Sequence, residues 1–254
     1  MKLEKKKLLS VFAVLCFGIV ISLGNISAER VNISGNTADS MQVTADLPVG
    51  DVKLEGESGE VRIDFDVLKT QNQDIYAWIT IPGTAIDYPI LQKQDSADPY
   101  DDYYLNHTID LEEGFPGAIY SQAINHADFM DPVTILYGHN LKDGGMFSSL
   151  HDFEDSDFFE ENRQAIIYLP DSTITYEIFA AVDFSDVLIP YAYDFADFTE
   201  VCRYLADVES CKGNFRKRIA FTEDDKILTL STCYSGREDR RLLIEAVMVD
   251  KVYF

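Results

Sequence analysis

Residues 61–254 predict a mainly β domain in which about eight short strands form a closed or nearly closed antiparallel barrel. Short apolar runs of β type recur between turn signals such as Pro82-Gly83, and long amphipathic helices are few. This succession favours an antiparallel barrel over a parallel α/β sheet, which needs a helix between most of its strands. The length of 254 residues allows one full-sized domain and a tail.

The elements of this domain are expected in a definite order. A short amphipathic helix over 61–76 comes first, because its apolar residues recur at helical spacing. The eight expected strands span 77–81, 86–91, 118–120, 133–137, 165–169, 173–182, 227–232 and 242–249. One or two helical turns are expected within 146–159. A late helix over 196–208 has an apolar face formed by Phe198, Val201, Cys202, Leu205 and Val208.

The N-terminal part of the chain predicts two segments outside the folded domain. Residues 1–28 contain four lysines followed by an uncharged stretch from Leu8 to Ala28, which as a helix rises about 30 Å and would cross a bilayer. The lysines are expected in the cytoplasm and the rest of the chain outside the cell. A cleaved signal peptide is the alternative, but Ile26 stands where a small residue is usual. Residues 29–60 are expected to be a flexible juxtamembrane linker.

The composition excludes several classes of function. With 21 basic and 44 acidic residues the chain has a net charge of −23, and a surface this acidic repels nucleic acid. The four cysteines form no C-x-x-C pair and the four histidines no H-E-x-x-H motif, so no metal site is expected. The glycine-rich motifs that bind nucleotide phosphates do not occur, so we expect no cofactor.

Cys233 is the cysteine whose surroundings favour reactivity. It follows the apolar run 227–232 and precedes a Tyr-Ser-Gly turn, so its thiol would be accessible while the strand fixes its main chain. A buried core cysteine is the alternative interpretation, and the histidines decide between the two.

His139 follows the expected strand 133–137 and therefore also lies at a strand end. Two strand ends can meet at one rim of a barrel, which would bring His139 to Cys233. The other histidines, His107, His126 and His151, lie in polar segments and are expected at the surface.

An arginine completes the candidate site. Arg240 and Arg241 precede the last apolar strand, and if that strand neighbours 227–232, its first residues lie near Cys233. A guanidinium there can stabilise a thiolate or an oxyanion. Successive side chains of a strand point to opposite faces, so only one arginine can reach the thiol.

These motifs resemble those of a known family. The run Thr229-Leu-Ser-Thr-Cys233 followed by Arg241 resembles the T-L-x-T-C…R signature of sortases, and Tyr137-Gly-His-Asn140 resembles their catalytic histidine motif. The segments 74–89, 103–107 and 137–147 and the helix 196–208 are similar to class B in particular. The resemblance covers about residues 61–254.

The resemblance implies an eight-stranded sortase barrel on the outer face of a Gram-positive membrane, with no metal or organic cofactor. Cys233 would attack the carbonyl of a threonine in the C-terminal sorting motif of a surface protein and form a thioacyl enzyme. His139 would give a proton to the departing amine, and Arg241, which directly precedes the apolar strand as the family's arginine does, would hold the substrate and the oxyanion. An amine of a peptidoglycan precursor, or a pilin lysine, would then resolve the acyl enzyme.

The resemblance also implies substrate contacts. Asn125, Tyr137 and Ser231 are the expected contacts, and Leu188 and Ile189 are expected to form a wall of the groove.

Other functions remain open at this point. A papain-like hydrolase usually has its cysteine before its histidine, whereas an L,D-transpeptidase has its arginine almost next to the cysteine. A pilin-polymerising sortase and a non-catalytic membrane-anchored binding module are further alternatives.

Overall fold

The computed structural model describes residues 52–55, 61–217 and 220–254. The expected membrane anchor, residues 1–28, lies outside the described residues. Within the described ranges, no helix is both long enough and apolar enough to span a bilayer.

The end of the expected linker, residues 29–60, differs from the prediction. β1 (Lys53–Glu55) pairs antiparallel with β2 (Val61–Ile63), and Val52 is 1% exposed. Val52 packs in one apolar cluster with Phe65 and Trp78. Regular structure therefore begins before residue 61, because an apolar residue ahead of β1 is buried against the domain.

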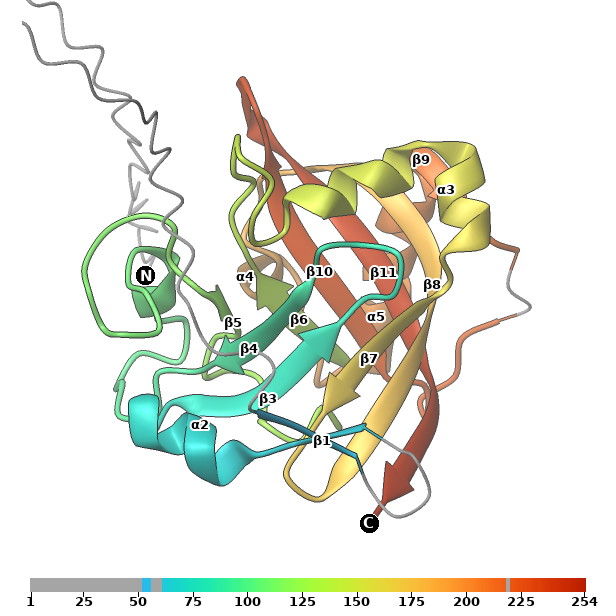
Figure 1. The fold of residues 1–254 in the computed structure, drawn as a ribbon. Coiled ribbons are helices and arrows are strands. Elements are labelled where there is room, and N and C mark those ends of the chain that lie inside the picture. The colour runs from blue at the N-terminus through green and yellow to red at the C-terminus, as the bar shows by residue number, and fades with distance from the viewer. Residues whose placement is uncertain (1–51, 56–60, 218–219) are drawn as a thin grey trace, which may run out of the picture. The chain divides into compact units, whose positions relative to one another are not determined.

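The predicted mainly β fold with an eight-stranded barrel is confirmed (Figure 1). In the described part of the chain the strands of the ring are β3 (Ile75–Thr80), β4 (Asp87–Leu91), β5 (Ile119–Tyr120), β6 (Val133–Tyr137), β7 (Gln164–Tyr168), β8 (Ser172–Ser185), β10 (Ile227–Tyr234) and β11 (Arg237–Tyr253). Their order is β11-β10-β6-β5-β4-β3-β7-β8, and β8 also pairs with β11, which closes the ring. β9 (Lys212–Phe215) pairs with β8 outside the ring and was not predicted.

Two pairings of the ring are parallel rather than antiparallel as expected. β4 pairs with β5 in parallel, and β6 pairs with β10 in parallel, whereas the other pairings are antiparallel. A parallel pair needs a crossing connection rather than a tight turn. The long segment between β4 and β5 provides one, and β6 and β10 are not consecutive strands.

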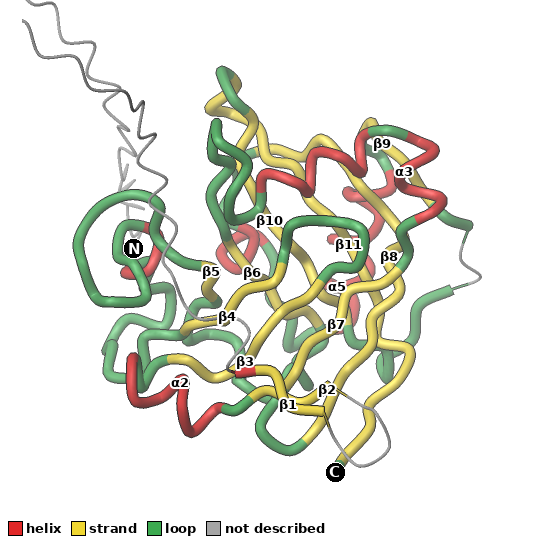
Figure 2. Tube along the Cα trace, viewed as in Figure 1, coloured by secondary structure: helices red, strands yellow, loops and turns green. Residues whose placement is uncertain are grey.

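The helices lie around the strands (Figure 2). The expected helix over 61–76 divides into β2, α2 and the start of β3, because Asp64 caps α2 by accepting from Val67 N at 3.0 Å. The helical elements of the described residues are α2 (Phe65–Gln71), η1 (Tyr103–Leu105), η2 (Ser148–Glu154), α3 (Ser156–Glu161), α4 (Ile189–Ala192) and α5 (Phe198–Glu209). η2 and α3 lie across one end of the barrel (Figure 1).

The late helix α5 confirms the predicted helix with one correction. Its buried residues Val201, Leu205 and Val208 match the predicted apolar face, and Asp197 caps its first turn. Cys202, predicted on that face, is exposed, because it lies about 100° around the helix from Val201. Tyr204 is buried instead.

The core explains why the end of β10 is fixed and yet exposed. Leu228 and Leu230 belong to an apolar cluster that also contains side chains of η2 and α3, while Ile227 belongs to a second cluster with α5. β10 is thus buried on both faces as far as Thr232, and the next residue, Cys233, is exposed. Packing holds the strand, and its end emerges into solvent.

Candidate active site

Cys233 and Arg241 are opposite each other on neighbouring strands. β10 and β11 pair antiparallel with Cys233 as the partner of Arg241, and the register shifts immediately after this pair. Directly opposed residues of an antiparallel pair project from the same face, with Cβ atoms about 5 Å apart. The predicted adjacency of these strands is therefore confirmed, and Arg241 is on the face of the thiol.

Arg240 is bound elsewhere. Its Nε donates to Asp183 Oδ1 at 2.5 Å, and Arg237 Nη2 lies 2.6 Å from Asp183 Oδ2. Burial alone would raise the pKa of Asp183, but the hydrogen bonds from the two arginines outweigh it and lower that pKa. Arg241 Nη1 instead donates to the main-chain oxygens of Glu238 and Arg240, each at 2.8 Å, so its charge is not neutralised by a carboxylate of the described chain.

His139 lies at the same rim as Cys233. In the parallel β6–β10 ladder Tyr137 is the partner of Ser231, and Gly138 N donates to Ser231 O at 3.2 Å. His139 and Cys233 are each two residues beyond that pair, on strands that lie about 4.8 Å apart. A Cβ atom at Gly138 would lie 2.5 Å from Ile119 Cδ1 and 2.7 Å from the buried Phe147 ring, so a larger residue there would force this packing to shift.

The imidazole of His139 is turned toward a loop. Its Nε2 is 2.7 Å from Leu105 O, and the Phe115 ring covers it with 4.6 Å between ring centroids. Because a carbonyl only accepts, Nε2 carries the proton. Burial lowers the pKa of His139, and the Leu105 carbonyl offsets part of this effect. Among the described residues no hydrogen bond joins the Cys233 thiol to His139 or Arg241.

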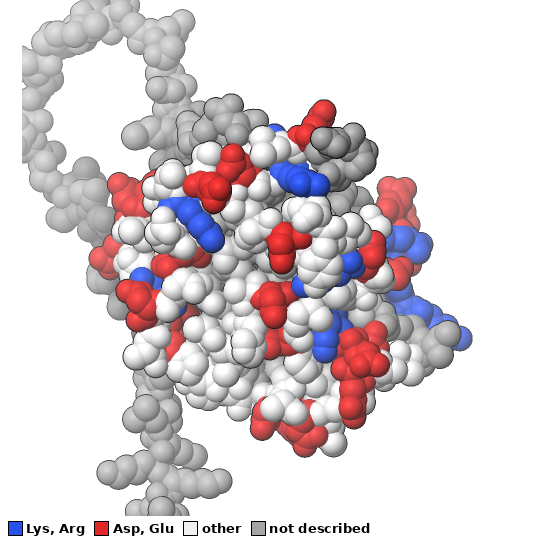
Figure 3. Space-filling model, turned by 90° about the horizontal axis from the view of Figure 1, so that it is seen from below, with Lys and Arg blue, Asp and Glu red and all other residues white. Residues whose placement is uncertain are grey.

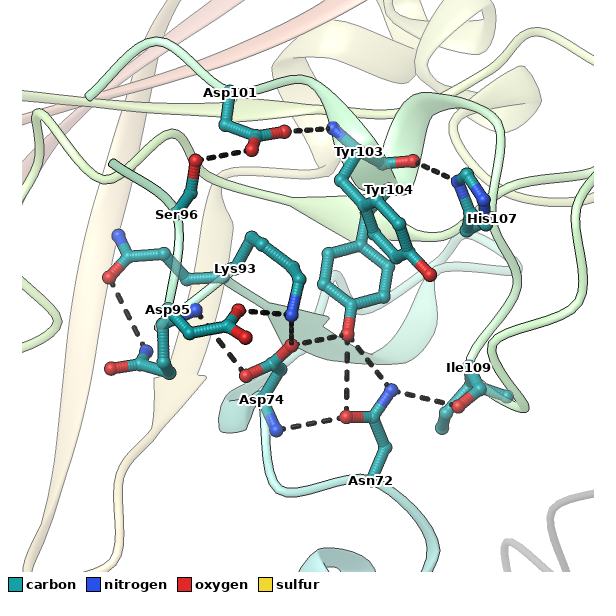
Figure 4. Close-up of polar contacts among 12 residues, drawn as sticks. Asn72, Asp74, Lys93, Asp95, Ser96, Asp101, Tyr103, Tyr104, His107 and Ile109 are labelled. Carbon is teal, nitrogen blue, oxygen red and sulfur yellow. Dashed lines mark hydrogen bonds and ion pairs between the residues drawn. The ribbon is translucent and has the colours of Figure 1, made fainter. Parts of the chain in front are cut away.

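The loop that carries Leu105 is fixed to the barrel by buried polar contacts (Figure 4). The fully buried Tyr104 donates to Asp74 Oδ2 at 2.7 Å, and Asn72 Nδ2 donates to Ile109 O at 2.9 Å. Buried hydrogen bonds of this kind hold a loop in one conformation. The Leu105 carbonyl is therefore a fixed acceptor for His139.

Two expected substrate contacts lie on the strands that lead to this rim. Ser231 is 7% exposed and Tyr137 is half-buried. The Tyr137 ring stacks on Tyr120 at 5.3 Å, and its hydroxyl donates to Gln122 Oε1 at 3.3 Å. Both residues are close to Cys233 along the ladder, and both are largely packed within the protein.

The side chain of Asn125, a third expected contact, is bound within the protein. Asn125 Nδ2 donates to Asp131 Oδ2 at 3.0 Å and to Val133 O at 2.8 Å, and its Oδ1 accepts from Ile135 N at 3.0 Å. These bonds hold the start of β6 and argue against a substrate contact.

Leu188 and Ile189, which were expected to form a wall of the groove, differ in their surroundings. Ile189 is 4% exposed and packs in the cluster with α5, so its side chain does not face a groove. Leu188 precedes α4 and is partly exposed.

Two residues of the site were not predicted. Asn140 Nδ2 donates to Cys233 O at 3.0 Å, and His151 Nε2 lies 3.1 Å from the same oxygen. His151 was expected at the surface because its segment is polar, and only the packing of η2 across the barrel end brings it to β10. No cluster of metal-binding side chains occurs within the part of the chain that the structure describes.

The comparisons with known proteins agree with this geometry. The sortase domain family matches residues 79–249. Sortase B of Listeria monocytogenes is 33% identical over 203 residues, which cover 79% of this chain and 80% of that protein. A crystal structure of Bacillus anthracis sortase B in complex with AAEK1 has a TM-score of 0.66 and 30% identity, and covers 80% of this chain and 93% of its own.

A second solved structure extends the comparison to a bound substrate. The Staphylococcus aureus sortase B–substrate complex has a TM-score of 0.63 and 26% identity, over 73% of this chain and 84% of that chain. The match of fold and sequence over most of the chain shows that this chain belongs to the sortase family as a class B sortase, a cysteine transpeptidase.

Proposed function

We propose that Cys233 is the nucleophile of this transpeptidase, that His139 is its proton donor and that Arg241 stabilises the oxyanion. The observation that carries the proposal is the direct pairing of Cys233 with Arg241 at the rim where β6 delivers His139. Arg241 shares the face of the thiol and is bound only by main-chain oxygens among its described contacts, which suits it to a thiolate and to the oxyanion that follows.

The reaction then takes place in two balanced halves. Cys233 reacts as the thiolate, with the proton of its thiol held by His139. The sulfur bonds to the threonine carbonyl carbon of the sorting motif, the C–N bond breaks, and the departing nitrogen takes that proton from the His139 imidazolium. An acceptor amine next attacks the thioester and gives a proton back to His139, a new C–N bond forms, and sulfur leaves as thiolate. No cofactor enters either half.

The partners follow from relatives. A Staphylococcus aureus sortase B is described with its substrate, and a further sortase B structure, 26% identical with a TM-score of 0.63, is complexed with triglycine. For this chain we propose a surface protein with a C-terminal sorting signal as acyl donor and an amine of a peptidoglycan precursor as acceptor. The acidic side chains scattered over the face in Figure 3 fit protein partners better than nucleic acid.

The proposed location follows from the sequence. The lysines and the apolar run of residues 1–28 support a single membrane anchor, with residues 29–60 as a connection of which 53–55 form a strand. The catalytic domain, residues 61–254, then acts outside the cell.

The proposal is tested by removing the sulfur. We expect Cys233→Ala to abolish both transpeptidation of a threonine-containing sorting peptide and formation of the acyl enzyme, measured by intact-protein mass. Cys202→Ala is the matched control, because Cys202 is also an exposed thiol but lies on α5. Turnover above trace level in Cys233→Ala, or loss of turnover in Cys202→Ala, would contradict the assignment.

A further inference from the structure

The main-chain carbonyl of Cys233 is hydrogen-bonded by side chains instead of by a neighbouring strand. In the β6–β10 ladder, Gly138 N donates to Ser231 O at 3.2 Å. The next carbonyl of β10 that points to the same side is that of Cys233, two residues later. β6 has ended by then, and the side chain of Asn140 donates to the Cys233 oxygen at 3.0 Å. Asn140 thus takes the place of the missing strand.

His151 is the second group at this oxygen. Its Nε2 is 3.1 Å from Cys233 O and 2.9 Å from Asn140 Nδ2, and its Nδ1 is 2.9 Å from Glu154 Oε2. The His151 side chain is only 21% exposed. It belongs to η2, whose packing in the core fixes the ring relative to β10.

The distances determine where the protons lie. A carboxylate only accepts, so the proton of a neutral His151 is on Nδ1, facing Glu154. Nε2 is then an acceptor, and the two hydrogens of the Asn140 amide serve Nε2 and Cys233 O. In a protonated ring, Nε2–H donates to Cys233 O directly. The carbonyl of Cys233 keeps a donor in either state.

Glu154 links His151 to Tyr234, the residue that follows Cys233 on β10. Its Oε1 accepts from the Tyr234 hydroxyl at 2.7 Å, and the Tyr234 ring meets His151 edge-on at 5.0 Å between centroids. This matters because the β10–β11 register shifts between Cys233 and Tyr234, where the ladder stops fixing the main chain.

We propose that Asn140, His151 and Glu154 form a carbonyl clamp that holds the main chain of Cys233 and thereby directs its thiol toward the face of Arg241. The proposal rests on Cys233 being the nucleophile, as proposed above. The three residues of the clamp are positioning residues, because their side chains contact the Cys233 oxygen, one another and Tyr234, and none of these contacts is with the Cys233 sulfur.

If the clamp positions Cys233, substituting one of its residues should lower the catalytic rate while the protein stays folded. Cys233 is exposed, so water can replace a lost donor on its carbonyl, and the folded state should persist. A nucleophile displaced by about 1 Å can lose roughly 100-fold in rate. We therefore expect Asn140→Ala to lower kcat roughly 10- to 100-fold with KM nearly unchanged.

The hydrogen bond itself is tested first, without any substrate. The full-length chain is labelled with ¹³C at the cysteine carbonyl carbon, and Cys233→Ala identifies the Cys233 resonance. Asn140→Ala should move this resonance in the direction of a weaker hydrogen bond. Asn140→Ala with His151→Ala, which also removes the protonated ring as a donor, should move it at least as far. His126→Gln is the matched control, because His126 also pairs with a carboxylate, Asp131 at 2.6 Å, but is 79% exposed and lies outside the clamp.

Kinetics of the same variants test the positioning. His151→Ala should lower kcat, and His151→Gln should restore most of it, because the glutamine amide can donate to Cys233 O without carrying a charge. A merely structural role would lower the fraction of active enzyme equally in both variants. His126→Gln should turn over like the unmodified chain.

The outcomes separate the two proposals. An unmoved carbonyl resonance in the Asn140→Ala and double variants would overturn the clamp, as would a moved resonance with unchanged kcat. If the unsubstituted chain shows no turnover, the proposed function is refuted. If Asn140→Ala still moves the carbonyl resonance in that case, the hydrogen bonds of the clamp remain supported.

Discussion

Glu245 provides a stability prediction whose size follows from burial. This residue of β11 is 0% exposed, and its carboxyl oxygens contact Tyr204 Oη at 2.5 Å and Thr229 Oγ1 at 2.8 Å. Burial raises the pKa of Glu245 to about 7, although both hydrogen bonds lower it, from a usual value of 4.5. The folded protein therefore favours the protonated carboxyl.

The sign of the pH dependence follows directly. Below pH 4.5 the carboxyl is protonated in both states, and its contribution to stability is fully present. As the pH rises toward 7, the unfolded chain loses the proton first, and the contribution is lost. At about 1.4 kcal/mol for each pH unit, the loss reaches about 3 kcal/mol above pH 7.

Glu245→Gln removes the titration and keeps the shape. We expect the free energy of unfolding of this variant, relative to the unmodified chain, to rise by about 3 kcal/mol between pH 4.5 and pH 8. Urea unfolding followed by the fluorescence of the single tryptophan, the buried Trp78, measures it. Glu177→Gln is the control, since it makes the same change at an exposed position of the neighbouring β8, and it should leave the free energy of unfolding nearly unchanged. A pH-independent difference for Glu245→Gln would refute the reasoning.

Two further predictions concern the rim. Arg241→Ala should lower kcat/KM by roughly 100-fold or more, as loss of an oxyanion donor does. Arg240→Ala should change kcat/KM little, because Asp183 binds Arg240. Steady-state kinetics that gave the opposite ranking would show the arginine assignment to be wrong. Phe115→Ala should raise the pKa of His139 toward its usual value, because it uncovers the ring; NMR titration of the imidazole measures this, and an unchanged or lower pKa would contradict it.

The sequence predicts the barrel well where strands are apolar and poorly where they are not. All eight ring strands carry apolar runs. Seven were predicted within three residues at each end, whereas β11 begins five residues earlier and ends four residues later than predicted. β9 has the sequence Lys-Gly-Asn-Phe and is largely exposed, so no hydrophobic pattern marks it, and only hydrogen bonds to β8 make it a strand. The parallel pairings were missed because hydrophobic pattern shows where a strand lies but not which strand it pairs with.

In the site, too, some features can be predicted from the sequence and others cannot. The positions of Cys233, His139 and Arg241 at one rim follow from strand ends and from the alternation of side chains, which the sequence contains. The direction of the His139 ring depends on Leu105, which is 34 residues away in the chain. The burial of Ile189 likewise depends on α5, and neither contact leaves a local pattern.

Nearness of the main chains does not by itself give a reactive arrangement of the side chains. If His139 is the proton donor, as proposed above, it must exchange the Leu105 carbonyl for the nitrogen of the leaving group before it can give up a proton. A neutral hydrogen bond of this kind has a net value of about 1 kcal/mol, or about a fivefold change in population. Substrate binding can readily overcome such a contact, so it is a weak restraint on the reaction. Among the described strands, the regular β10–β11 ladder ends at the pairing of Cys233 with Arg241, so the side chains that hold the main chain of Cys233 should have the larger effect on rate.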